Sequence, residues 1–133
     1  MDRSLRIIVV DDMPAMRSIV RNMLEDMGFT RIVEAEDGEL AWHLIRNAAA
    51  TPAEAIGLVI ADWNMPGMSG VDLLRAVRSS AATRAVPFLM VTAKGDNAHI
   101  AEAVRAGVTD YVVKPFSGAQ LGDKLSQLFP SAP

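Results

Sequence analysis

No cysteine occurs in this sequence. That absence excludes a disulfide framework, a thiol nucleophile and a thiolate metal site. Near the N-terminus only four apolar residues run together before two acids, far short of a signal sequence or of the roughly 20 residues that span a bilayer. A formal net charge of −3 gives no strong field that would suit nucleic acid or an anionic membrane. We therefore expect a cytoplasmic protein that has neither nucleic acid nor a membrane as a direct partner.

The composition is typical of a globular chain. Hydrophobic residues make up 50% of the 133 residues and charged residues 22%, a balance that supports a buried core. The length suits one domain and is too short for two ordinary ones. The sequence contains no internal repeat, linker or shift of composition, so we expect one domain.

Short apolar runs alternate with segments of helical periodicity. In the first such segment apolar residues recur at intervals of three and four from Met16 to Met27, with Pro14 near the first turn and Gly28 just past the end. The same reading along the chain predicts strands at residues 5–10, 31–35, 56–61, 86–92 and 110–114. It predicts helices at about 14–27, 37–48, 70–77, 96–106 and 121–129.

Strands that alternate with helices through short loops imply a parallel sheet with helices on both faces, because each parallel neighbour needs a right-handed crossover. The predicted fold class is therefore α/β, a doubly wound five-stranded parallel sheet with five helices. In such a sheet the carboxyl ends of the strands meet at one edge, where ligands bind.

Charged or polar side chains stand at the carboxyl ends of four predicted strands. They are Asp11 and Asp12, Asp62, Thr92 and Lys114. Taken singly, Asp12 could be a helix N-cap, Thr92 could cap a turn, and Lys114 could be a surface lysine. Three acids, a hydroxyl and a lysine at one sheet edge are costly to cluster without an ion that organises them. We therefore interpret the set as one site.

The chemistry that this set suits is phosphoryl transfer with Mg²⁺. Carboxylates are the hard oxygen ligands that Mg²⁺ prefers, and the ion would remove the repulsion between them. Lys114 and Thr92 would supply positive charge and a hydrogen-bond donor to a phosphoryl oxygen. A carboxylate can also be the nucleophile and form an aspartyl phosphate. Asp62 stands alone at the end of a central strand, so we expect it to be the phosphoacceptor.

Four motifs carry a family resemblance: VVDDMPAMR, ADWNMPGMSG, MVTA and YVVKPF, in this order on consecutive predicted strands. They resemble the signature elements of response-regulator receiver domains, most of all the single-domain chemotaxis regulators, and the resemblance covers nearly the whole chain. It implies a flavodoxin-like fold and one receiver domain over residues 1–133 with no output domain. It also implies a phosphorylation-activated response regulator of a two-component system.

The resemblance assigns roles at the acidic cluster. Asp62 would receive its phosphoryl group from a histidine kinase. Asp12 and Asp62 would bind Mg²⁺ directly, Asp11 would act mostly through water, and Asn64 would contribute its backbone carbonyl.

The resemblance also assigns a switch. Thr92 would hydrogen-bond the phosphoryl group, Lys114 would pair with it, and the bond from Lys114 to Pro115 would be cis. The small Ala93 would leave the site open. Tyr111 would swing inward as Thr92 moves, repacking the face made by the fourth helix, fifth strand and fifth helix. The plainer alternative is that Tyr111 only packs in the core.

Two departures from the resembled regulators concern output. Lys94 stands two residues after Thr92, where those regulators carry an acid, and with Asn64 it borders the path of the hydrolytic water. We predict that Lys94 changes the lifetime of the phosphorylated state. Of the basic residues that the output face offers to an acidic motor peptide, only Lys124 remains. A flagellar motor switch is therefore one hypothesis for the partner.

Plain roles are expected for the nearby aromatic and histidine residues. Trp63 is interpreted as an exposed aromatic that shields the site, and His43 and His99 as surface histidines without a phosphorelay or metal role.

Other classes of function share parts of this pattern. A Mg²⁺-dependent phosphohydrolase with an aspartyl intermediate would need a second acid two residues after the nucleophile, where Asn64 stands. A flavin-binding module would need a first loop that cradles phosphate, and DDMPAMR would repel it. We therefore favour a monomeric binding switch that is not an enzyme. It would act in chemotaxis or as a stand-alone adaptor in a phosphorelay or kinase-regulating pathway.

Overall fold

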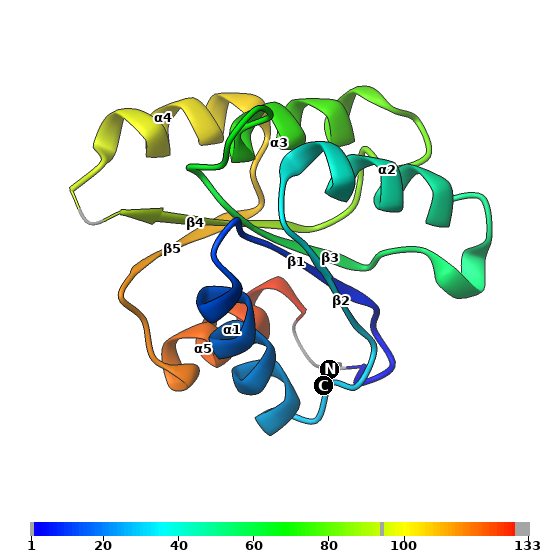
Figure 1. The fold of residues 1–133 in the computed structure, drawn as a ribbon, viewed down its shortest axis with the longest axis horizontal. Helices are drawn as coiled ribbons and strands as arrows, with labels where there is room; N and C mark the ends of the chain where they lie inside the picture. Colours follow the sequence, from blue (N-terminus) through cyan, green and yellow to red (C-terminus); the bar gives the residue numbers. More distant parts are fainter. Residues whose placement is uncertain (1, 94, 130–133) are drawn as a thin grey trace.

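Each strand is followed by a helix, so neighbouring strands run parallel (Figure 1). The computed structural model describes residues 2–93 and 95–129. Its strands are β1 (Ile7–Val10), β2 (Ile32–Ala35), β3 (Leu58–Asp62), β4 (Phe88–Ala93) and β5 (Asp110–Lys114). Its helices are α1 (Pro14–Asp26), α2 (Gly38–Ala48), α3 (Gly70–Ser79), α4 (Asn97–Ala106) and α5 (Gly118–Leu128), with a short 3-10 helix, η1 (Pro52–Glu54).

The strand order β2-β1-β3-β4-β5 creates a switch point between β1 and β3. From β1 the chain crosses to β2 on one side and then returns to β3 on the other. In open parallel sheets, ligands bind outside the carboxyl ends of the strands at such a point. The predicted five-stranded doubly wound α/β fold is confirmed for the described residues.

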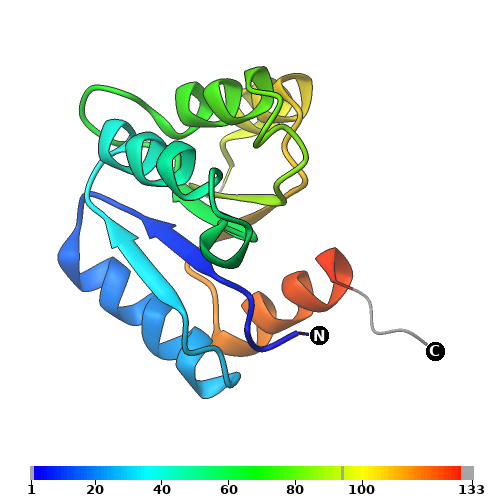
Figure 2. The same cartoon turned by 90° about the vertical axis from the view of Figure 1, so that its right-hand side faces the viewer.

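Helices α2, α3 and α4 cover one face of the sheet, and α1 and α5 cover the other (Figures 1 and 2). Alternate residues of the central strands enter the two cores. In β1, Ile8 and Val10 pack under the three helices, whereas Ile7 and Val9 pack against the other two. A strand buried on both faces must be apolar throughout, so the first polar residues of β1 come at its carboxyl end.

Element boundaries differ from the predicted ones by at most three residues. The third strand includes Asp62, because β4 continues far enough to pair Asp62 with Val91. Asp96 precedes α4 as its N-cap and accepts a hydrogen bond from the His99 N–H. The N-cap position of α1 is Met13, so Asp12 does not cap that helix.

None of the helices in the described part of the chain is a candidate membrane span. Within residues 2–93 and 95–129, every helix is too short or too polar to cross a bilayer.

Candidate functional site at the carboxyl edge of the sheet

Three carboxylates meet at the carboxyl ends of β1 and β3. One oxygen from each of Asp11, Asp12 and Asp62 lies within 4.8 Å of the others. The register of the two strands explains why the acids meet, because Val10 of β1 pairs with Ala61 of β3 and the residue that follows each of them is an acid. Asp11 and Asp62 are only 6% and 7% exposed, whereas Asp12 is exposed. Two buried acids and one accessible acid thus share a small volume.

Lys114 brings positive charge to the same place from the end of β5. Its Nζ lies 2.9 Å from Asp62 Oδ1 and 3.9 Å from Asp11 Oδ2. The side chain is 30% exposed, so the alternative of a plain surface lysine is wrong. A buried carboxylate is costly without a partner, and this ion pair offsets part of that cost for Asp62.

The ionised form of Asp11 remains disfavoured in spite of Lys114. Burial raises the pKa of the Asp11 carboxyl above its ordinary value, and the charges of Asp62 and Asp12 act in the same direction. A hydrogen bond from the Met13 N–H to Asp11 Oδ1, 2.9 Å long, and the Lys114 charge act against the rise in pKa. A bound cation would favour the ionised form that burial disfavours.

Thr92 supplies a hydroxyl that no other described residue binds. Its side chain, on β4, is 2% exposed, and its Oγ1 has no hydrogen-bond partner among the described residues. A side chain that caps a turn bonds to the backbone, so the interpretation of Thr92 as a turn cap is wrong. Buried hydroxyls are usually paired, so this unpaired one is unusual. The unpaired Oγ1 and the three carboxylates fit a hard cation together with an oxyanion that accepts a hydrogen bond.

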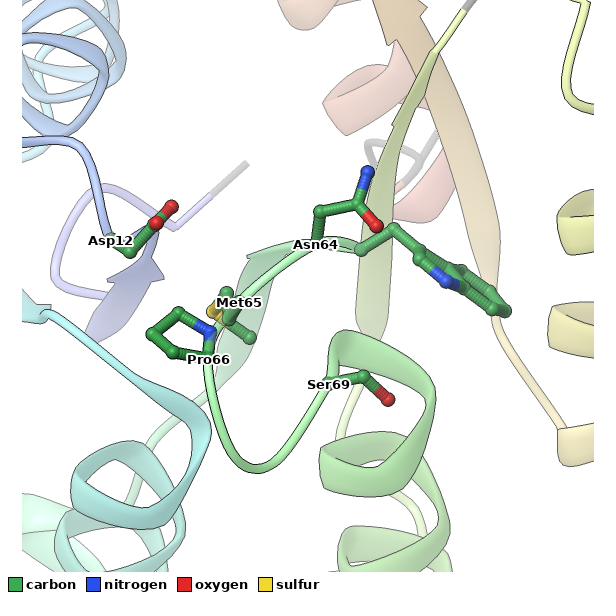
Figure 3. Close-up of a pocket in the computed structure, with 6 residues that line it drawn as sticks. Asp12, Asn64, Met65, Pro66 and Ser69 are labelled. Atoms are coloured by element: carbon green, nitrogen blue, oxygen red, sulfur yellow. The ribbon is translucent and has the colours of Figure 1, made fainter.

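An open cleft gives access to the cluster. Figure 3 shows Asp12 on one side of it and the loop from Asn64 to Pro66 on the other, with Ser69 at the start of α3. Asn64 is exposed, and it reaches this cleft because the chain turns away from β3 directly after Asp62. The arrangement brings Asp12 and Asn64 to one opening at the carboxyl edge.

Comparison with known proteins identifies the family. Residues 7–126 match the response regulator receiver domain. The chain belongs to this family. Receiver domains are signalling modules, not classical enzymes, and they take a phosphoryl group from a kinase and act on a downstream partner. This chain is therefore a phosphorylation-activated response regulator, as the sequence motifs predict.

Relatives and solved structures cover nearly the whole chain. The chemotaxis protein CheY of Pseudomonas aeruginosa is 43% identical over 125 residues, which are 94% of this chain and 96% of that protein. The structure of the chemotaxis response regulator CheY4 of Vibrio cholerae has a TM-score of 0.84 at 28% identity, with 95% and 99% of the two chains covered.

A third comparison concerns the metal. The receiver domain of a sensor histidine kinase from Pseudomonas aeruginosa has a TM-score of 0.80 at 26% identity, with 96% and 99% of the chains covered. That structure has a magnesium ion coordinated in its active-site cleft.

The other residues that the motifs singled out lie on β4, on β5 and directly after β5. The Lys114–Pro115 bond is cis, as predicted. Ala93 pairs with Lys114 across β4 and β5. Tyr111 is partly buried, and the Lys124 ammonium lies 5.3 Å from the centre of its ring. Lys94 lies outside the described residues, so its effect stays a prediction.

Sequence reasoning missed how Trp63 is held. The side chain is 6% exposed, so the prediction of an exposed aromatic is wrong. It stacks on the ring of His99 from α4, and His99 Nδ1 also contacts the Asp96 carboxylate. His99 is therefore more than a plain surface histidine. The spacing of Asp96 and His99 on a predicted helix could have indicated their contact, but no local pattern indicates the stack.

Proposed function

We propose that this receiver domain accepts a phosphoryl group on Asp62 in a Mg²⁺-dependent reaction and then changes its affinity for a partner protein. The single observation that carries the proposal is the position of Asp62. Its carboxylate ends a buried central strand, lies 2.9 Å from the Lys114 ammonium and shares a 4.8 Å cluster with two further acids.

Residues of the cluster would hold Mg²⁺. We assign Asp12 and Asp62 as direct ligands, Asp11 as a ligand mostly through water, and the backbone carbonyl of Asn64 as a further oxygen. The hard oxygen atoms of this set support Mg²⁺, and a similar receiver domain contains that ion. When bound, Mg²⁺ would neutralise charge on the phosphoryl oxygens.

The proposed transfer converts a phosphohistidine into an aspartyl phosphate. An Asp62 carboxylate oxygen attacks phosphorus, a P–O bond forms, the P–N bond of the donor breaks, and the leaving imidazole nitrogen takes up a proton. Lys114 pairs with a phosphoryl oxygen, and the free Thr92 Oγ1 donates a hydrogen bond to another.

Thr92 and Tyr111 would transmit the phosphorylation signal to the surface. A Thr92 hydroxyl drawn to the phosphoryl group moves the end of β4, and Tyr111 on the neighbouring strand β5 repacks in response. Tyr111 lines a surface depression with Phe116, Gln120 and Lys124. We assign the face made by α4, β5 and α5 as the surface that binds the downstream partner.

The proposed phosphodonor is a histidine kinase, and the proposed process is chemotaxis. The 43% identical CheY protein supports chemotaxis, with the flagellar motor switch as the partner to test first. A stand-alone adaptor that passes phosphate onward or regulates a kinase is the alternative. We place the transfer of the phosphoryl group from kinase to Asp62 in the cytoplasm, where the ATP that supplies kinases is found.

The proposed unit is a monomer consisting of one receiver domain over residues 1–133, because residues of one chain complete the site. Rapid hydrolysis, as in a phosphohydrolase, is not part of the proposal, since the place of a second acid is held by Asn64. Lys94 would tune how long the phosphoryl group persists.

Intact mass spectrometry after brief incubation with acetyl phosphate and an acid quench tests the proposal. We expect one added phosphoryl group that requires both Mg²⁺ and Asp62, so that it disappears in Asp62→Asn. Asp26→Asn, which removes an exposed acid at the end of α1, is the matched control and should still be labelled. A folded wild type that gains no adduct, and releases no phosphate, would overturn the proposal.

A further inference from the structure

Arg17 is a partly buried charge that the proposed phosphoryl chemistry does not use. Its side chain, in the second turn of α1, is only 16% exposed. The Nη1 group donates a hydrogen bond to the backbone carbonyl of Asp11, 2.7 Å away. The Nε group donates to Glu34 Oε1 at 3.2 Å. One guanidinium therefore joins α1 to the loop that follows β1 and to strand β2.

Glu34 anchors this guanidinium and also binds a second arginine, Arg21. Arg21 Nη1 donates to the second oxygen of Glu34 at 2.7 Å, and its Nη2 donates to the Ile32 carbonyl at 3.2 Å. Glu34 pairs with Val9 in the sheet, so its backbone position is fixed. Arg17 is thereby anchored on a rigid element before it reaches the site.

The Asp11 main chain lies where the strand pattern ends. Its N–H still donates to the Ala35 carbonyl at 3.2 Å, and its carboxylate accepts from the Met13 N–H. Its carbonyl belongs to the peptide unit that continues to Asp12, and Arg17 provides a donor for that carbonyl. Because a peptide unit is planar, fixing this oxygen also fixes the direction in which the chain enters Asp12.

We propose that Arg17 is a positioning residue for the metal site, which holds the Asp11–Asp12 peptide unit so that both carboxylates face Asp62. The inference rests on the proposed function, since it needs a cation to bind at the acidic cluster. Partners that orient metal ligands from behind affect affinity strongly: their removal typically costs 10- to 100-fold.

Arg21 provides a matched control. It shares Glu34 with Arg17 and lies one turn farther along the same helix, but among the described residues it contacts Glu34, Ile32 and Glu25, not the Asp11 carbonyl. Loss of either arginine removes one positive charge and one bond to Glu34. Only loss of Arg17 releases the Asp11 carbonyl.

The experiment is a Mg²⁺ titration of wild type, Arg17→Met and Arg21→Met. Trp63 fluorescence reports binding, because this buried side chain lines the cleft with Asp12, and Trp42→Phe in every protein removes the other tryptophan. We expect Arg17→Met to raise the dissociation constant roughly tenfold and Arg21→Met to leave it within about twofold. Urea unfolding of both variants measures the destabilisation that they share.

Phosphorylation by acetyl phosphate gives a second measurement that a merely structural role would not move. In Arg17→Met the Mg²⁺ concentration for half-maximal rate should rise roughly tenfold, while the rate at saturating Mg²⁺ stays within about threefold of wild type. A structural defect would instead lower the amount of active protein and leave the Mg²⁺ concentration for half-maximal rate unchanged.

Four outcomes are decisive. An Arg17→Met affinity within twofold of wild type, or equal weakening in both variants, overturns the positioning role. If Arg17→Met does not fold, Arg17→Lys decides. The lysine ammonium is a point charge and lacks the rigid fork with which Arg17 reaches Glu34 through Nε and the Asp11 carbonyl through Nη1, so we expect roughly threefold weaker binding, and unchanged affinity overturns the role. A wild type that shows no Mg²⁺-dependent adduct overturns the proposed function itself.

Discussion

Trp63 and His99 stack with ring centroids 4.1 Å apart and planes 14° from parallel. The contact joins the residue directly after Asp62 to the first turn of α4. It thus connects the candidate phosphoacceptor strand to a helix of the proposed output face. Contacts of this kind can transmit a local change, because packed elements move as units.

The first prediction concerns this stack. His99→Ala removes one of its two rings, so Trp63 becomes more exposed, its fluorescence emission shifts to the red, and the free energy of unfolding falls by about 0.5–1.5 kcal/mol. Urea unfolding and emission spectra in a Trp42→Phe background measure both effects. His43→Ala is the control, since His43 is exposed on α2 and bonds only to Asn47 among the described residues. Equal spectra for the two variants would contradict the role of the stack.

The second prediction is a pH dependence set by Asp11. Burial raises the pKa of this carboxyl above its ordinary value of 3.8, so the folded chain binds the proton more tightly than the unfolded chain does. Stability contributed by this group is therefore lost as pH rises through the folded pKa. Asp11→Asn removes that loss and keeps an oxygen for the Met13 N–H. At about pH 7 the variant should be more stable than wild type by about 0.5–2 kcal/mol.

The same comparison at lower pH checks the cause. The stability difference should shrink as pH falls through the raised pKa of Asp11 toward values below the ordinary 3.8, because the Asp11 carboxyl then becomes neutral like the amide of the variant. Asp26→Asn, at an exposed position, should show no such trend. A stability difference that is constant with pH would mean that the gain has a source other than the Asp11 charge.

The third prediction follows from the unpaired Thr92 hydroxyl. Thr92→Val keeps the shape and removes a buried polar group that has no partner among the described residues, so the free energy of unfolding should stay equal or rise by about 1 kcal/mol. Thr83→Val is the matched control, because Thr83 Oγ1 is buried and donates to the Val77 carbonyl at 2.8 Å. That variant should lose about 1 kcal/mol.

Urea unfolding separates the two threonines. A loss at Thr92 as large as that at Thr83 would mean that the Thr92 hydroxyl is already bonded. In that case it would not be free to donate to a phosphoryl oxygen.

The acidic cluster could be predicted because it follows from the backbone. Once β1 and β3 are parallel neighbours, the acids that end them must meet, whatever the side chains do elsewhere. The buried apolar runs and helical stripes identify the strands and helices, and the rules of crossover connections limit the strand order without determining it. The place of Asp11, Asp62 and Lys114 at one edge could therefore be predicted from residue type and position along a strand alone.

Contacts between side chains of different elements could not be predicted in this way. Arg17 and Glu34 are 17 positions apart, and each belongs to a pattern that is fully explained without the other. Trp63 follows an acid and precedes Asn64, so its local sequence indicates exposure, but it packs in the core under α2, α3 and α4 and stacks on His99. Such pairs depend on the angle between packed elements, which periodicity does not encode.

The fourth prediction is that removing the Lys114 charge has opposite effects on Mg²⁺ affinity and on the rate of phosphorylation. The ammonium lies 2.9 Å from Asp62 Oδ1, so it competes with a cation for the same carboxylate. Lys114→Met should therefore bind Mg²⁺ about three- to tenfold more tightly. The same variant loses the group that pairs with the transferred phosphoryl oxygen, so its labelling by acetyl phosphate at saturating Mg²⁺ should slow by roughly 10²-fold.

Lys124→Met tests whether the location of the charge matters. It removes the same charge from the α5 surface, where Lys124 pairs with Asp110 at 3.3 Å, so Mg²⁺ affinity should stay within about twofold of wild type. Titration by Trp63 fluorescence and mass spectrometry of the adduct measure the two effects on the same samples. Opposite shifts in affinity and rate at Lys114, with neither at Lys124, would place this lysine on the phosphoryl group. Weaker Mg²⁺ binding in Lys114→Met would show that the ammonium supports the metal site instead of competing with the cation.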